Sequence, residues 1–499
     1  MLPTCQAHSG IILPVTKEQF TVDSPLNHRK GPKMTTSLRA PLADVDAVHV
    51  AISGSIAITG NHVEILDADH VRSSVIDALV YTSTFGEDRA RDLARWIIRA
   101  AAPNLGAFPA SINDLYFAAG RGEYAHATAP AINVRGMTFD KAQAAFRAAR
   151  ANDNQIVLFE IARSEMAYTW QRPAEYAASI LAAAIKSDWH GPVFIQGDHF
   201  QALRSAYAAD PAKEIGIVRD LTAEAIAAGF YNIDIDASTL VDIDEPDLVV
   251  QQEKNYRHTA ELTAFIRSIE PEGITVSVGG EIGEVGKHNS TVADLEAFMT
   301  GYVPALATLG DSLTGMSKIS VQTGTSHGGI VLADGTIQEV AVDFETLAAL
   351  SKAAREQFGI GGAVQHGAST LPESAFGKFA EANAIEVHLA TAFQSILFDS
   401  VHFPDDLRAR INAWLIENRA QERKEGETDL QFLHKTRKRA FGPFKRDLWD
   451  LPEETRHRLM EELEGAYGNI MRRLGVSGTT ALVDRIVKPV AIELPAPPS

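Results

Sequence analysis

From about Pro130 onward, short β-rich runs alternate with amphipathic stretches whose apolar residues recur at helical spacing. Several runs are apolar at consecutive positions, which is typical of parallel strands covered by helices. Strict alternation of strand and helix predicts parallel β-α units. Eight repeats predict an α/β fold closed into a (β/α)8 barrel, the TIM barrel, rather than an open doubly wound sheet. The predicted strands cover residues 130–134, 155–162, 192–196, 230–235, 274–280, 318–324, 362–367 and 385–390.

The segments on both sides of this pattern predict additions to the barrel. Residues 47–58 have a strand-like pattern and residues 89–102 a helical one. The charged helical stretches after the last strand are expected to form a solvated extension, with the basic run 435–439 on the surface or in a subunit contact. The predicted organisation is a disordered leader at residues 1–39, an N-terminal extension or small α/β domain at 40–125, the catalytic barrel at 126–400, and a helical C-terminal extension with its tail at 401–499.

Charge and composition narrow the classes of partner. The 499 residues carry a formal net charge of −18, and a binder of nucleic acid or of an anionic membrane would need a basic face, so neither partner is expected. No run approaches the ~20 apolar residues of a membrane span. Cys5 is the only cysteine, so any metal must be held by His, Asp and Glu, and a reducing, cytoplasmic location fits. A phosphorylated sugar remains compatible, because a metal ion and helix N-termini can make one pocket positive.

Acids and imidazoles follow six successive predicted strands, and the C-terminal ends of barrel strands carry the reactive groups of this fold. Three of the histidines come from different strands and can meet around one tetrahedral ion, which leaves a position open for water or substrate. Each histidine taken alone is more often a loop or core residue than a metal ligand, so the argument depends on their joint placement. Burial of so many ionisable groups without a metal or partners would be costly. The groups are Asp198, His199, Asp234, Glu281, His327, His366 and His388.

Glycines next to two of the histidines give a second signal. Gly-Thr-Ser-His-Gly-Gly at 324–329 and His-Gly-Ala-Ser at 366–369 place exposed backbone N–H groups directly after His327 and His366. Loops after the late barrel strands commonly form a phosphate cradle. A tight turn that merely needs glycine is the alternative interpretation of each motif.

In these motifs the chain resembles the class II, metal-dependent fructose-bisphosphate and tagatose-bisphosphate aldolase family, from about residue 129 to 394. The matching motifs are Asp198-His199, Ile233-Asp234, Glu281-Ile282-Gly283, GTSHG around His327 and HGAS from His366. The resemblance implies that His199, His327 and His366 bind a divalent metal, with zinc expected first and manganese or cobalt as alternatives. It implies that Asp198 is the acid/base that transfers the proton. Asp234 and Glu281 would support the metal site, and Gly328, Gly367 and Ser369 would contact the ketose phosphate.

The chain departs from the family pattern on the eighth strand. The family's Asn-Ile-Asp-Thr appears here as His388-Leu389-Ala390-Thr391, so only Thr391 of the phosphate-contacting residues is retained. His388 stands where the family uses Asn to contact the enediolate, and as a titratable group it is expected to add acid/base capacity. This change leaves both the substrate and the reaction open.

Three hypotheses of function follow. The first is a metal-dependent lyase that cleaves a ketose phosphate reversibly by aldol chemistry through a metal-stabilised enediolate. The second is a metal-dependent epimerase of a sugar, sugar acid or sugar phosphate on the same barrel. The third is a non-catalytic subunit of an aldolase complex, against which the retained histidines and Asp198 argue. The resemblance also implies a homodimer or homotetramer.

Overall fold

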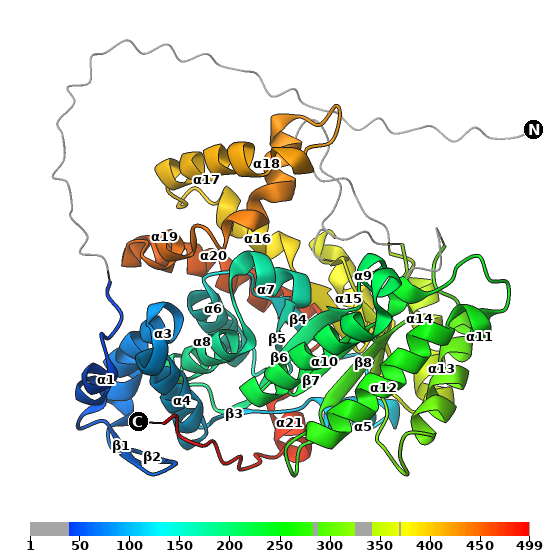
Figure 1. The fold of residues 1–499 in the computed structure, drawn as a ribbon, viewed down its shortest axis with the longest axis horizontal. Helices are drawn as coiled ribbons and strands as arrows, with labels where there is room; N and C mark the ends of the chain where they lie inside the picture. The colour runs from blue at the N-terminus through cyan, green and yellow to red at the C-terminus, as the bar shows by residue number, and fades with distance from the viewer. Residues whose placement is uncertain (1–38, 283–287, 325–341, 369–370, 499) are drawn as a thin grey trace, which may run out of the picture. The chain divides into compact units, whose positions relative to one another are not determined.

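The computed structural model describes residues 39–282, 288–324, 342–368 and 371–498. Within them, eight parallel strands close into a barrel, because the first strand, β4, pairs with the last, β11, and β6 pairs with both β5 and β7. Each predicted strand overlaps one of these, so the predicted (β/α)8 barrel is confirmed (Figure 1). The strands are β4 Ala129–Asn133, β5 Leu158–Ala162, β6 Gly191–Gln201, β7 Asn232–Asp236, β8 Ser277–Glu281, β9 Lys318–Val321, β10 Ala363–Gln365 and β11 Glu386–Leu389.

Helices separate the strands along the chain and surround the barrel (Figure 1). Their ends carry the expected signals. The Asp210 side chain accepts a hydrogen bond from the backbone N–H of Lys213 at the start of α10, and Gly229 ends that helix with a φ of 98°. The helices are α5 Asn113–Gly120, α6 Thr138–Ala151, α7 Arg163–Thr169, α8 Pro173–Lys186, α9 Arg204–Ala209, α10 Pro211–Ala228, α11 Leu248–Gln251, α12 Glu253–Ile269, α13 Val292–Ala307, α14 Phe344–Phe358, α15 Phe376–Glu381 and α16 Thr391–Asp399. None of the helices in the described residues is both long and apolar enough to cross a lipid bilayer.

The N-terminal segment packs on the outside of the barrel. Its helices α3 Ile76–Phe85 and α4 Asp88–Asn104 cover α8, and its strand β3 Ala107–Pro109 pairs with the start of β6. The helix expected at 89–102 is confirmed by α4. The strand expected at 47–58 is wrong over most of its length, since α1 Val45–Ile52 is a helix. The Asp44 side chain caps that helix through the Ala47 N–H, and only β1 Ile56–Thr59 pairs with β2 His62–Ile65.

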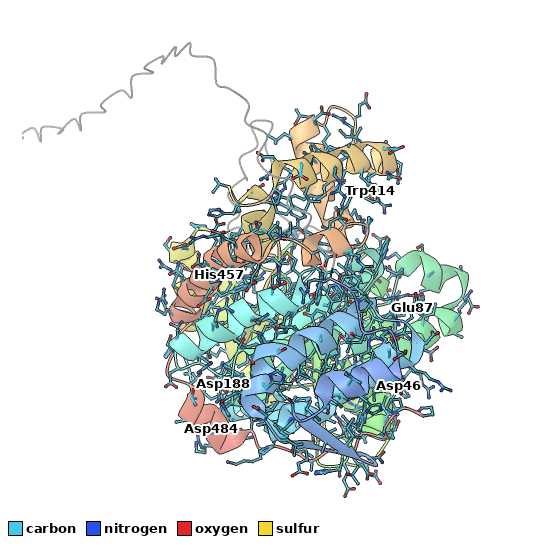
Figure 2. All side chains as sticks on the ribbon, turned by 90° about the vertical axis from the view of Figure 1, so that its left-hand side faces the viewer. Asp46, Glu87, Asp188, Trp414, His457 and Asp484 are labelled. Atoms are coloured by element: carbon cyan, nitrogen blue, oxygen red, sulfur yellow. The ribbon has the colours of Figure 1, made fainter. Side chains whose placement is uncertain are left out.

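The C-terminal extension consists of helices, as predicted. They are α17 Asp405–Asn418, α18 Asp429–Thr436, α19 Lys445–Trp449, α20 Glu453–Arg473 and α21 Thr480–Ile486. The longest, α20, packs along α6, where Arg456 pairs with Asp140 at 2.8 Å and Glu464 pairs with Arg147 at 2.6 Å. Figure 2 shows His457 on α20 beside the barrel's outer helices and Trp414 on α17 farther out. Apolar residues of α20 belong to the same core as those of the barrel.

Leu463 of α20 is fully buried, so Leu463→Ala is expected to lower the free energy of unfolding by about 2–5 kcal/mol, through lost burial and the cavity left behind. Urea denaturation followed by circular dichroism measures the change. Leu430→Ala removes a side chain that is 52% exposed and is the control, with a change expected within about 0.5 kcal/mol. Equal effects of the two variants would show that α20 does not stabilise the barrel.

Candidate active site

The third barrel strand, β6, is irregular where it ends. The pairing of β6 with β7 shifts between Gly197 and Phe200, and His199 has a φ of 41°, which is uncommon for a side chain larger than glycine. A Cβ on Gly197 would lie 2.4 Å from the Phe200 ring, so this bend needs glycine. The bulge gives Asp198 and His199 directions that a regular strand would not allow.

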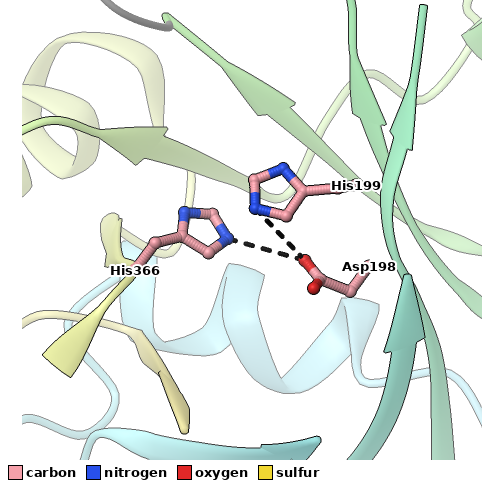
Figure 3. Close-up of side chains that lie close together, drawn as sticks. All are labelled: Asp198, His199 and His366. Carbon is pink, nitrogen blue, oxygen red and sulfur yellow. Dashed lines mark ion pairs between the residues drawn. The ribbon is translucent and has the colours of Figure 1, made fainter. Parts of the chain in front are cut away.

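Asp198 lies among three imidazoles that come from three strands. Its Oδ1 is 3.2 Å from His388 Nδ1, 3.6 Å from His366 Nε2 and 3.8 Å from His199 Nε2. The ring centroids of His199 and His366 are 4.3 Å apart, and those of His366 and His388 are 4.1 Å apart. Figure 3 shows the His199 and His366 rings turned toward the Asp198 carboxylate. The structure therefore brings together four of the residues expected at the site.

His199 is oriented by carboxylates on its other side. Its Nδ1 lies 3.1 Å from Asp236 Oδ2 and 3.1 Å from Glu281 Oε2, while Ser238 donates a 2.6 Å hydrogen bond to Asp236. In the neutral form of His199 that a metal would require, carboxylates at Nδ1 favour the tautomer in which Nδ1 carries the proton and Nε2 presents its lone pair on the side of His366 and Asp198. Glu281 thus lies where it was expected. Asp236 was missed, although two-residue strand periodicity puts it on the same face as Asp234.

The donor set fits a divalent metal. One ligand atom each from Asp198, His199 and His366 lies within 4.8 Å of the other two, and all three residues lie at the C-terminal mouth of the barrel. Imidazole nitrogen with carboxylate oxygen suits zinc, and such sites also take cobalt or manganese. The third expected ligand, His327, lies outside the described residues, as do Gly328 and Ser369.

Beneath this cluster, Lys318 on β9 balances several buried acids. Its Nζ is 2.7 Å from Glu386, 2.9 Å from Asp234 and 2.7 Å from the Gln196 amide oxygen. Glu386 also accepts a hydrogen bond from the buried Tyr116 hydroxyl. Asp234, expected to support the metal site, is therefore the ion-pair partner of a lysine. Its pKa is raised to about 6, because burial outweighs the effect of the Lys318 charge.

His388 connects these buried acids to the cluster of Asp198, His199 and His366, called the upper cluster below. Its Nε2 lies 2.6 Å from Glu386 and its Nδ1 lies 2.9 Å from Glu160, in addition to the contact with Asp198. Burial alone would lower the pKa of His388, but the charges of Glu160 and Asp198 hold it well above its usual range. His388 is therefore an imidazolium with carboxylates at both nitrogens.

The two carboxylates beside His388 differ in their affinity for protons. Burial raises the pKa of Glu160 to about 8, despite the opposing charge of His388. Burial would also raise the pKa of Asp198, but the charges of His199 and His388 hold it well below its usual range. Asp198 is thus a carboxylate at neutral pH, whereas Glu160 takes up a proton far more readily than Asp198 does. Sequence reasoning assigned no role to Glu160 or Lys318, and their position in strands with inward-facing polar residues is the signal that was available.

A cavity of about 940 Å³ opens above these groups. Glu160, Asp198, His199, His366 and His388 line its floor, and Gly367 and Thr391, expected to contact a phosphate, line it as well. Residues of the C-terminal extension complete the wall; they are Lys424, Glu425, Gly426, Glu427, Gln431, His434, Lys435 and Lys438.

The basic run 435–439 was expected on the surface or in a subunit contact, and the structure places part of it in the cavity wall instead of on a solvated surface. Lys435 and Lys438 face the cavity, and Arg437 is buried, where it pairs with Asp399 at 2.5 Å and donates to Ser395. The acids next to these residues in the sequence suggested a surface, but Asp399 lies on α16, directly after the eighth strand. This extension thus forms part of the site rather than a separate surface.

The chain belongs to the family described as fructose-bisphosphate aldolase class-II, whose sequence model matches residues 110–440. No curated protein matches the chain by sequence.

Among solved structures, the chain is similar to the fructuronate-tagaturonate epimerase UxaE from Cohnella laeviribosi, with 14% identity over 71% of this chain and 82% of that chain and a TM-score of 0.50. It is also similar to the YdjI aldolase from Escherichia coli K12, with 14% identity, 74% and 99% coverage and a TM-score of 0.46. Fructose-bisphosphate aldolase from Campylobacter jejuni gives 16% identity, 75% and 96% coverage and a TM-score of 0.44. At these identities the likeness shows the fold alone.

Lys318→Met is expected to lower the free energy of unfolding by about 3–5 kcal/mol, because it leaves Asp234 and Glu386 as buried charges without their cation. Equilibrium unfolding in urea measures the change. The control is Lys352→Met, which removes a lysine that is 70% exposed and 4.0 Å from Glu356; less than about 1 kcal/mol is expected. A loss for Lys318→Met as small as that of the control would contradict the role of Lys318 as the balancing charge.

Proposed function

We propose that this protein is a metal-dependent lyase that cleaves a ketose phosphate reversibly by aldol chemistry. The observation that carries the proposal is the position of Asp198, a carboxylate among three imidazoles at the floor of a large cavity. Membership of the class II aldolase family supports the reaction class.

His199 and His366, with His327 as the third ligand, would hold the ion, and zinc suits them best. A divalent ion bound there would supply a Lewis acid for the carbonyl oxygen of the ketose. Asp236 and Glu281 keep Nε2 of His199 available by occupying its Nδ1 side.

The protein's own groups manage the proton. In the cleavage direction, Asp198 accepts the proton of the hydroxyl on the carbon that becomes the aldehyde. The carbon–carbon bond breaks, and its electron pair moves toward the ketose carbonyl to give an enediolate. The enediolate carbon then takes up the proton that Asp198 carries, which completes the second product and returns Asp198 to its carboxylate form. The His388 imidazolium, 3.2 Å from Asp198, adds positive charge beside the developing anion.

Glu160 gives the site a second proton carrier. With a pKa of about 8 and a 2.9 Å contact to His388, it can exchange a proton with the imidazole near neutral pH. On the phosphate side, Gly367 and Thr391 line the cavity and are the proposed contacts of the ketose phosphate, together with Gly328 and Ser369.

The contact between His388 and Glu160 favours a second candidate function, an epimerase of a sugar, sugar acid or sugar phosphate. Epimerisation needs a proton, or a carbon–carbon bond, to be removed and restored on the opposite face of one carbon. Asp198 and the His388–Glu160 pair supply two acid/base groups in one cavity. Interconversion of two ketoses without release of a triose phosphate would assign this function instead.

The test is a panel of ketose phosphates with a coupled assay for triose phosphate, run with zinc, manganese and cobalt. Activity that a chelator removes and metal restores is expected. His366→Ala is expected to lose bound metal and activity together, because His366 supplies one of the ligand nitrogens. Elemental analysis measures the metal. A His366→Ala variant that stays active after chelation would remove this mechanism, and a wild type without metal or activity would favour the non-catalytic subunit.

Asp198→Asn is expected to lower kcat by about 10²–10⁴-fold, since the amide cannot accept the hydroxyl proton. The metal content is expected to stay close to that of the wild type, because the proposed ligands His199, His327 and His366 are unchanged and Asp198 is assigned to the proton rather than to the ion. Steady-state kinetics with parallel elemental analysis separates the two effects. Turnover equal to that of the wild type would reject the acid/base role of Asp198.

A further inference from the structure

Three basic side chains lie near one another where the barrel meets the C-terminal extension. Arg135 follows β4, Lys141 lies on α6, and Lys438 lies in the short turn of helix after α18. Burial and then the charge of Arg135 lower the pKa of Lys141 to about 7. The same two causes lower the pKa of Lys438, so both amines feel the guanidinium. Arg135 and Lys438 line the cavity.

The carboxylates nearby do not balance this charge. Glu165 pairs with Arg135 at 2.6 Å, and its other oxygen accepts hydrogen bonds from the Asn133 amide and the Ala162 N–H. Among the described residues, no carboxylate lies within ion-pair distance of Lys438 Nζ, and none accepts a hydrogen bond from Nη2 of Arg135. Glu165 and, from farther away, Glu422 and Asp198 offset part of the positive charge, but none of them pairs directly with Lys438.

A second lysine of the same segment shows the contrast. Lys435 also lines the cavity, but its Nζ is 2.6 Å from Glu427 and 2.8 Å from the Glu422 carbonyl. Its charge is already balanced within the extension. Lys438 lies three residues further along the chain and lacks such a partner among the described residues.

We propose that Arg135 and Lys438 form a subsite for an oxyanion of the substrate, a phosphate ester or a carboxylate, so that the C-terminal extension completes the substrate site. Nη1 of Arg135 lies 3.3 Å from Gln394, in the first turn of α16, whose N-terminal N–H groups favour an anion at the same place. Guanidinium and ammonium groups that are partly shielded from water bind phosphate and carboxylate through charge-assisted hydrogen bonds. Which substrate carries the anion rests on the proposed function, whereas the existence of the anion subsite rests on the charges of Arg135 and Lys438.

Calorimetric titration of the full-length protein with glycerol 3-phosphate and with glycerate tests the subsite without turnover, because the two probes differ mainly in their anion. Lys438→Met is expected to weaken binding of the probe that the wild type binds, glycerol 3-phosphate or glycerate, at least tenfold. The affinity of Lys438→Arg for that probe is expected to stay within threefold of the wild type. Lys435→Met is the matched control and is expected to stay within twofold. Thermal unfolding of each variant confirms that it is folded.

Loss of affinity in Lys438→Met for glycerol 3-phosphate alone assigns a phosphate subsite, and loss for glycerate alone assigns a carboxylate subsite. Wild-type affinity of Lys438→Met for both probes, or no binding of either probe by the wild type, overturns the proposal. An affinity that depends on Lys438 in a protein that releases no triose phosphate would keep the subsite and reject the lyase.

Discussion

The structure depends on keeping charge balanced inside the barrel. Glu160, Asp198, Asp234 and Glu386 are all nearly inaccessible to water. A carboxylate in such a place is tolerated only if it is paired, hydrogen-bonded or protonated. Here these solutions occur side by side. The cation of Lys318 pairs with two of the acids, the ring nitrogens of His388 lie within 3.8 Å of all four, and burial raises the pKa of Glu160 to about 8.

This balance also fixes the geometry of the upper cluster. His388 has a carboxylate at each ring nitrogen, so its orientation is determined from below by Glu386 and from the side by Glu160. His199 is held through one nitrogen, since Asp236 and Glu281 both lie 3.1 Å from its Nδ1. Rings that are fixed by their outer hydrogen bonds meet a ligand in a constant arrangement, which is what a metal site or a charged intermediate requires.

The sequence predicted the barrel well because its evidence is local and repeated. Each strand–helix unit carries its own periodicity, and each motif lies at a strand end. The prediction failed where a single local signal opposed the pattern, as Asp44 does by starting a helix in an apolar stretch that resembles a strand. It could not find the pairing of Lys318 with Glu386, because those residues are 68 positions apart and nothing in one sequence shows which inward side chains face each other. The basic run 435–439 was misread for a related reason, since its tertiary partners lie on other elements.

The burial of α8 shows that the folded domain needs the helices that precede the barrel. Most of its residues are inaccessible to water, because α3 and α4 cover the side that a barrel helix normally shows to solvent. The match to the aldolase family starts at residue 110, after both of those helices, yet residues 39–499 form one compact unit. Shared ancestry and independent folding therefore mark different boundaries here. A fragment cut where the family resemblance starts would expose an alanine- and isoleucine-rich helix to water, and such a surface promotes aggregation.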